Sequence, residues 1–276
     1  VYFLAGSLPG TAHLHLRQLS LFGMITRLNE NILNKYAQNI YSSAIIRNKS
    51  WFHQIRDLCL QYPLPHPLQL LSQPVSKLKF KKLIKSHVIN YWEIKLRNEA
   101  SSLKSLQYFN PRFMSLKWPH LIWTTVGSSP AKVAMATVQA QFLSGRYRTQ
   151  HLCSLWSAHT SECCQLSMAC QNQPEDINHI LTSCEALIPT RQKMRQFSLK
   201  YSENKDFIKQ LVIKYSNPEH PQFCQYLLDC SVLSDVIVAK QNYGNDILDH
   251  LFHITRTYCY NLHKDRMKLL GRWNPF

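Results

Sequence analysis

The sequence predicts a mainly α-helical fold, in which helical bundle segments surround one small module rich in cysteine and histidine. The first observation is composition: the 276 residues include only 7 glycines, while leucine and isoleucine are common. The second is periodicity, because apolar residues recur three and four positions apart, as on one face of a helix. The third is residues 164–184, which gather three cysteines and one histidine in a pattern typical of a closed metal site.

Helices separated by a proline-rich break are expected in the first half of the chain. Ser50 suits the N-cap of a helix over about 51–61, and three prolines within 62–67 then end it. A long helical region is expected over about 75–106. Residues 11–28 form the first expected helix, whose apolar residues at helical spacing are Leu14, Leu21, Phe22, Ile25 and Leu28.

Helices are also expected in the second half, after an irregular connector over about 118–130. Pro130 suits the first turn of a helix that runs to Leu143, and Gly145 suits the stop after its end. The closing helix has a basic end that complements the helix dipole. Its inward side chains are expected to be Leu248, Leu251, Phe252, Cys259 and Leu262. The four helices after the cysteine-rich segment are expected over about 187–200, 203–215, 221–240 and 246–270.

The cysteine-rich segment reads C-x5-C-x8-H-x4-C, and its candidate ligands for one Zn²⁺ are Cys164, Cys170, His179 and Cys184. Soft thiolates and one imidazole suit a tetrahedral zinc ion. The polar, turn-like stretch 171–176 lets the chain fold back so that both halves reach one metal. Four protein ligands leave no open position for water, so the predicted role is structural.

Two alternatives stand beside this zinc prediction. The His-x4-Cys half matches retroviral-type zinc knuckles, but their first pair is C-x2-C, and here Ser167 stands at that place. Cys163 could therefore replace Cys164 as the first ligand. The cysteines could also be free thiols that pack as small apolar residues. We expect that packing role for Cys59, Cys153, Cys224, Cys230 and Cys259.

Positive charge is concentrated before the zinc segment. Residues 1–145 carry 17 Lys and Arg against 4 acids, whereas residues 146–276 carry 15 against 12. Within 77–85 five lysines alternate with apolar residues, so that on a helix Leu78, Leu83 and Ile84 can face a core. The lysines would then attract a polyanion, or else form an ordinary solvated face. The candidate nucleic-acid contacts are Lys77, Lys79, Lys81, Lys82, Lys85, Arg146, Tyr147 and Arg148.

Catalytic patterns are missing from the sequence. A polymerase needs paired aspartates to hold two metal ions, and no Asp-Asp pair occurs. The one adjacent acidic pair, Glu175-Asp176, is expected to open the short helix that carries His179. A metal-dependent nuclease built on this pair is disfavoured, because a closed site has no place for a reactive water.

Several observations suggest an intracellular chain. No run of 18 apolar residues predicts a membrane span, and the opening residues lack a signal peptide's basic region. The odd number of cysteines favours a reducing compartment, the nucleus and cytoplasm. The chain begins with Val1, which suggests a piece of a longer protein.

Five segments together resemble the carboxy-terminal region of LINE-type (non-LTR) retrotransposon reverse transcriptases. Leu8–Ile25 is similar to the stretch that follows the polymerase palm in those polyproteins. The other pieces follow in the same order along essentially the whole chain. They are Ser50–Ile55, Ser144–Thr149, the zinc segment through Leu187 with Arg191 after it, and Arg256–His263.

The resemblance implies a non-catalytic tail that grips template RNA or target DNA during target-primed reverse transcription. It implies thumb-end helices over 1–50, a basic helical linker over 51–145, a zinc-knuckle-like module over 146–200 and a helical module over 201–276. The polymerase aspartates would lie upstream, on a domain of the same polyprotein. Only the four predicted zinc ligands map onto a functional motif of that family.

An alternative function is a helical interaction module that docks onto the polymerase core, with a purely structural zinc. Exposed aromatic side chains would supply such an interface, although aromatic residues more often lie in a core. The candidates are Trp51, Phe52, Trp92, Trp118 and Trp123.

Overall fold

The computed structural model describes residues 2–28 and 50–272. Over these ranges the chain is mainly helical and has no strand, which confirms the predicted fold class. One isolated antiparallel bridge joins Cys163 to Pro174. The chain divides into two compact units, which we call the N-terminal unit (2–100 and 115–118) and the C-terminal unit (101–114 and 119–272). The boundary between the two units, near residue 100, falls inside the region 51–145 that the resemblance implies.

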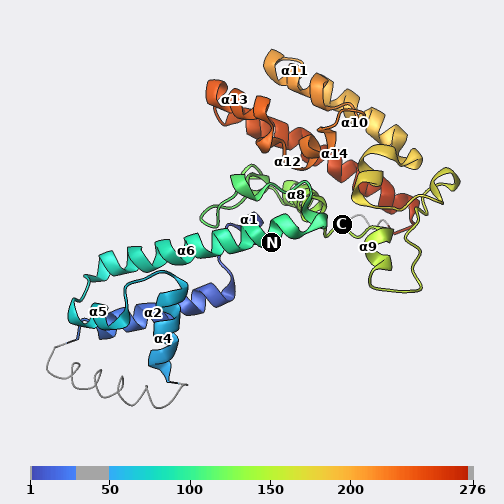
Figure 1. Cartoon of the computed structure of the whole chain (residues 1–276). Coiled ribbons are helices and arrows are strands. Elements are labelled where there is room, and N and C mark those ends of the chain that lie inside the picture. Colours follow the sequence, from blue (N-terminus) through green and yellow to red (C-terminus); the bar gives the residue numbers. More distant parts are fainter. Residues whose placement is uncertain (1, 29–49, 273–276) are drawn as a thin grey trace. The chain divides into compact units, whose positions relative to one another are not determined.

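The N-terminal unit is built from helices joined by short connectors (Figure 1). Ser50 caps its α4 helix as predicted, since the Ser50 side chain accepts a hydrogen bond from the backbone N–H of His53. After the predicted break, Pro67 occupies the first turn of α5. The helices are α1 (Tyr2–Ala5), α2 (Gly10–Ile25), α4 (Trp51–Gln61), α5 (Pro67–Ser72) and α6 (Lys77–Ser102).

Tyr62 lies at the centre of the N-terminal unit and is fully buried. Its hydroxyl accepts a hydrogen bond from Trp92 Nε1 at 3.1 Å and lies 2.5 Å from His15 Nδ1. The ring of Tyr91 packs edge-on against it, with centroids 5.1 Å apart. These contacts fasten α2, the end of α4 and α6 to one another, because His15 belongs to α2, Tyr62 follows α4, and Tyr91 and Trp92 belong to α6.

The inner face of α2 differs from the predicted one. Ala12, Leu19, Phe22 and Gly23 are the buried residues of this helix, whereas two of the expected apolar positions, Leu14 and Leu21, are exposed. Gly23 explains the orientation, because the Phe80 ring of α6 lies where a Cβ on Gly23 would be, 2.2 Å from its Cε1. Leu28 is exposed and lies beyond the helix end.

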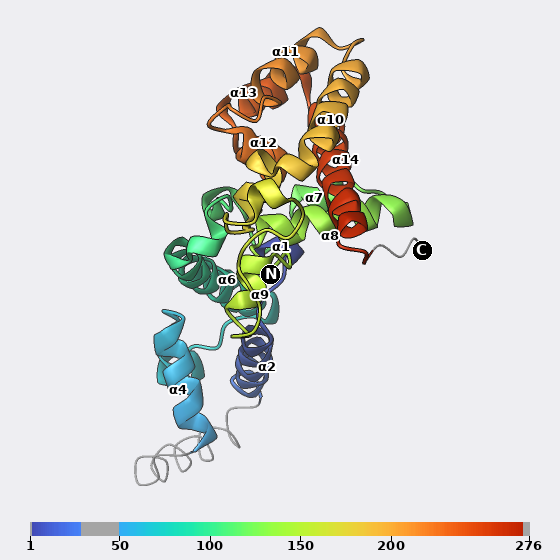
Figure 2. The same cartoon turned by 90° about the vertical axis from the view of Figure 1, so that its right-hand side faces the viewer.

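The C-terminal unit is organised around α14 (Asp246–Leu269), against which α8, α10, α12 and α13 pack (Figures 1 and 2). All five side chains predicted to point inward from this helix are buried. The other α-helices are α7 (Leu121–Thr124), α8 (Pro130–Leu143), α9 (Gln150–Ser154), α10 (Ile188–Tyr201), α11 (Asp206–Tyr215), α12 (Phe223–Asp229) and α13 (Ser234–Tyr243). Short turns are η1 (Lys104–Leu106), η2 (Pro111–Phe113), η3 (Met168–Cys170), η4 (His179–Ser183), η5 (Glu185–Leu187) and η6 (Cys230–Val232).

Helix α8 agrees with its sequence signals at both ends. It begins at Pro130, ends at Leu143, and is followed by Gly145 with a positive φ of 65°. In its interior the fully buried Gln139 donates to Leu227 O at 2.7 Å and to Thr255 Oγ1 at 3.0 Å. This amide therefore links α8 to α12 and α14 inside the core.

The single helix predicted over 221–240 is instead broken into α12, η6 and α13. The cause is Asp229, which is fully buried and accepts hydrogen bonds from Ser231 N and Oγ. Its second oxygen lies 3.3 Å from Nε2 of the buried His120. Because the carboxylate holds the following backbone in a turn, the α-helix ends there.

Candidate basic surface and metal centre

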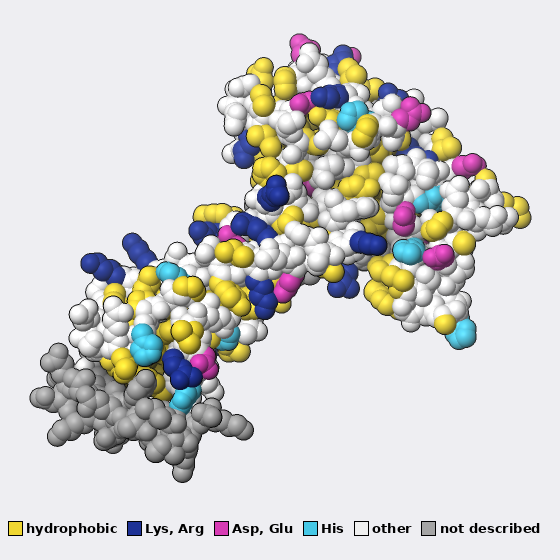
Figure 3. All heavy atoms as spheres, in the orientation of Figure 1, with side chains coloured by type: hydrophobic (Ala, Val, Ile, Leu, Met, Phe, Trp, Pro, Cys, Tyr) yellow, Lys and Arg dark blue, Asp and Glu magenta, His cyan; other side chains and the backbone are white. Residues whose placement is uncertain are grey.

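The five lysines of 77–85 are all exposed on α6, and Figure 3 shows basic side chains along the surface over this helix. No acidic residue occurs in α6 before Glu93. The predicted inner face was wrong in part, because Leu78 is 72% exposed, while Ile84 is buried. The residues that α6 buries are Phe80, Ile84, Val88, Ile89 and Trp92.

Tyr147 does not lie on the surface predicted for it. It is 3% exposed, its ring stacks on Phe142 with centroids 3.9 Å apart, and its hydroxyl lies 2.9 Å from His263 Nδ1. Burial raises its pKa to about 12. The ring has no free face for a base, so the prediction that Tyr147 contacts nucleic acid is wrong. Its neighbours Arg146 and Arg148 are exposed as expected.

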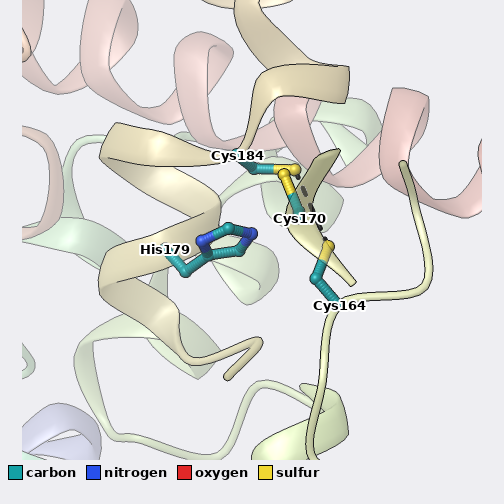
Figure 4. Close-up of side chains that lie close together, drawn as sticks. All are labelled: Cys164, Cys170, His179 and Cys184. Atoms are coloured by element: carbon teal, nitrogen blue, oxygen red, sulfur yellow. Dashed lines mark hydrogen bonds between the residues drawn. The ribbon is translucent and has the colours of Figure 1, made fainter. Parts of the chain in front are cut away.

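The four predicted metal ligands come together in the C-terminal unit. The donor atoms of Cys164, Cys170, His179 and Cys184 lie within 4.8 Å of one another, and all four residues are buried. Figure 4 shows the sulfurs and the imidazole edge facing a common point. The Sγ atoms of Cys164 and Cys184 are 3.9 Å apart. Tetrahedral metal–sulfur bonds of about 2.3 Å place two sulfurs about 3.8 Å apart, so the group could hold one metal ion.

His179 has its ring nitrogens in two different environments. Its Nδ1 lies 3.2 Å from Ser183 Oγ, whereas its Nε2 is buried and has no hydrogen-bond partner among the described residues. Burial lowers the pKa of this imidazole, which favours the neutral form that binds metals. A buried acceptor without a hydrogen-bond donor raises the free energy of the folded state, and a metal ion bound at Nε2 would remove this penalty.

The backbone decides between the two adjacent cysteines. The amide of Cys164 donates to Gln173 O at 2.9 Å, beside the bridge between Cys163 and Pro174. Successive side chains of an extended segment point to opposite sides. The Cys164 side chain therefore points toward the other three candidate ligands and is buried, whereas Cys163 is half-buried and does not belong to the group. Cys164 is therefore the first candidate ligand.

A widened turn positions the other half of the group. The Asp176 carboxylate accepts the backbone N–H of His179 at 2.7 Å, as expected of a residue that opens a helical turn. Residues 179–183 then form one π-helical turn, in which Cys184 N donates to His179 O at 2.8 Å. This turn brings the fourth ligand beside the third. The N–H of Glu185 points at Cys170 Sγ from 3.4 Å.

Burial keeps the thiols of Cys164 and Cys184 neutral in the absence of a cation. It raises the pKa of Cys164, and it raises the pKa of Cys184 to about 12. A metal ion reverses this by displacing the thiol protons, so metal binding and folding of the segment are coupled. A divalent ion with three thiolates and a neutral imidazole would carry one net negative charge.

Arg191 supports the candidate metal centre from α10, a role not predicted from the sequence. It is 6% exposed and donates to Cys184 O at 2.6 Å and to Ile180 O at 3.4 Å. Burial lowers the pKa of its guanidinium, and the thiols of Cys184 and Cys170 oppose that shift when ionised. Arg191 therefore anchors the π-helical turn and places positive charge beside the sulfurs.

Glu175 and Arg266 form a buried ion pair close to the same module. Glu175 also accepts the backbone N–H of Gln150 at 3.0 Å, and the Arg266 guanidinium lies over the Tyr147 ring, 5.3 Å from its centroid. Arg266, within the basic end of α14, is thus buried and paired. Glu175 Oε1 is engaged in this pair.

Comparisons with known proteins identify no family. No family model matches the chain, and no curated protein or solved structure is significantly similar to it. Among the described residues, no helix combines the length and the apolar character needed to cross a bilayer.

Proposed function

We propose that this chain is a non-catalytic nucleic-acid-binding tail of a LINE-type reverse transcriptase, which grips template RNA or target DNA. The observation that carries the proposal is the exposed row of lysines on α6, uninterrupted by acidic residues before Glu93. Such a surface attracts phosphates and releases their counterions. The segments that resemble the retrotransposon family support the identity of the parent protein, the upstream polymerase domain as its partner, and a nuclear and cytoplasmic location.

We further propose that the buried cysteine and histidine group holds one structural Zn²⁺. Three thiolates with one imidazole form a donor set that suits zinc better than magnesium or calcium, which prefer oxygen ligands. Four protein ligands close the coordination shell, so the ion organises residues 164–184 and does not activate water. In this proposal the metal centre maintains the fold of the C-terminal unit, while α6 of the N-terminal unit contacts phosphate.

The basic surface is tested by neutralising lysines in the full chain. Changing Lys79, Lys81, Lys82 and Lys85 to Gln should weaken binding of single-stranded RNA and DNA. It should also reduce the slope of log affinity against log salt by about 3, since each lost phosphate contact accounts for about 0.7 on single strands. The measurement is fluorescence anisotropy over a salt series.

A matched variant controls for the overall loss of charge. It changes four exposed lysines of the C-terminal unit to Gln, and its salt slope should stay near that of the wild type. Equal losses in both variants, or no binding by the wild type near physiological salt, would contradict the proposal. The control positions are Lys193, Lys200, Lys205 and Lys240.

Docking onto the polymerase core is the second candidate function. The observation that favours it is an exposed apolar face on α2, where Leu14, Leu21 and Met24 recur at helical spacing. Of the aromatic residues predicted for such an interface, Phe52 and Trp92 are buried, and only Trp118 is largely exposed. If docking is the main role, the four-lysine variant should still associate with a polymerase core.

A further inference from the structure

A hollow of about 710 Å³ lies on the N-terminal unit beside the lysine row. Lys82 and Lys85 of α6 line it, together with Lys117 from the segment 115–118. Its apolar part comes from Ile89, Leu116 and Trp118. No acidic side chain is among the described residues that line it, so it combines three ammonium groups with apolar surface, the Trp118 indole and the His13 imidazole.

Trp118 presents most of its side chain to solvent, being 74% exposed. An exposed indole is unusual, because tryptophan is highly buried on average. The other described tryptophan with comparable exposure is Trp156 of the C-terminal unit, at 62%. Trp118 differs from it in having lysines around the same hollow.

The segment that carries Trp118 is fastened to α6. Oε1 of Glu93 accepts hydrogen bonds from Leu116 N and from Ser115 Oγ, both at 3.0 Å. The Ser115 hydroxyl in turn accepts the Lys117 N–H at 3.1 Å, and Leu116 is buried. These bonds fix the backbone next to the indole, so that little conformational entropy is lost when a flat ligand stacks on it.

We infer that this hollow binds unpaired nucleotides, with one base stacked on Trp118 and the flanking phosphates held by Lys82, Lys85 and Lys117. The inference rests on the proposed function and adds the class of nucleic acid that is bound. Stacking on an exposed aromatic ring requires a base with a free face, and a base inside a duplex has both faces covered by its neighbours. The lysines favour a polyanionic ligand, and the exposed indole favours a single strand over a duplex.

The test compares strands and duplex on the full chain. The probes are a fluorescein-labelled 12-nucleotide RNA, the DNA of the same sequence, and each strand annealed to its complement. Trp118→Ala should weaken single-strand binding about tenfold, the typical loss for one stacked base, and should change duplex binding little. Trp118→Phe should restore most of the affinity, because a ring is regained. Trp156→Ala is the control for an exposed tryptophan outside the hollow.

The outcomes separate this inference from the proposed function. If the wild type binds in a salt-dependent way but Trp118→Ala and Trp156→Ala both bind single strands like the wild type, the stacking site is refuted and the basic surface stands. An equal loss of duplex binding in Trp118→Ala would also refute it. If the wild type binds no nucleic acid near physiological salt, both proposals fail. A 4-thiouridine RNA that crosslinks to Trp118, located by mass spectrometry, would support the site directly.

Discussion

Arg191 is a single buried side chain that supports the candidate metal centre. Its donors satisfy the carbonyl of the candidate ligand Cys184 and the carbonyl of Ile180 within the π-helical turn. Its own carbonyl accepts a hydrogen bond from Tyr258 Oη at 3.4 Å, which connects the turn to α14. A guanidinium suits this place, because it keeps its charge when buried and offers several donors in one plane.

Replacing Arg191 should therefore weaken metal binding without touching a ligand. Arg191→Met keeps much of the volume but removes the donors and the positive charge beside three thiolates. Residues that hydrogen-bond to the ligands of a metal typically contribute 10–100-fold to metal affinity, and we expect a loss of about that size. Competition with a chromophoric chelator measures it. Arg195→Met, on the exposed face of the same helix, should bind metal normally, and equal affinity in both variants would contradict the role.

Helices α2 and α6 approach each other closely at Gly23. Gly23 is buried against the Phe80 ring, and Phe80 is itself 4% exposed and cannot easily move. A β-carbon at position 23 would meet ring atoms at 2.2 and 2.3 Å, well inside van der Waals contact. Glycine is thus required by packing between two elements and not by its own backbone conformation.

Gly23→Ala should destabilise the N-terminal unit by about 1–3 kcal/mol, the typical effect of overpacking a core. Urea unfolding followed by circular dichroism measures the free energy, and hydrogen exchange of α2 and α6 amides localises it. Gly10→Ala is the matched control on the same helix, since nothing lies within 4 Å of its added β-carbon. If Gly23→Ala is as stable as Gly10→Ala, the prediction is contradicted, and α2 and α6 can move apart at little cost in free energy.

The candidate nucleic-acid surface and the candidate metal centre lie in different units. The lysine row and the Trp118 hollow belong to the N-terminal unit, and the cysteine and histidine group belongs to the C-terminal unit. Metal removal should therefore unfold one unit while the basic surface remains. This division makes the metal assignment testable independently of nucleic-acid binding.

Elemental analysis of the purified chain should find one zinc per molecule. Cys164→Ser and His179→Ala should lose it, because each removes a ligand, while the adjacent Cys163→Ser should keep it. Chelation should accelerate hydrogen exchange in 164–201 and leave the amides of α6 protected, since the ion organises only the C-terminal unit. A folded wild type without zinc, or loss of zinc in Cys163→Ser, would overturn the assignment.

Features that depend on neighbours along the chain could be predicted from the amino-acid sequence. The Ser50 cap of α4, the Pro130 start of α8 and its Gly145 stop follow from local backbone chemistry, and the structure confirms all three. The four candidate metal ligands could also be predicted from the sequence, because their spacing within 21 residues is a local pattern.

Packing between segments distant in the chain sets which face each helix buries and which residues it contacts. Glu175 and Arg266 pair across 91 residues, and Tyr147 is buried between Phe142 and His263. The inner face of α2 depends on Phe80 meeting Gly23. Local periodicity predicts that a helix forms. It does not predict what packs against the helix, because burial depends on residues distant in the chain.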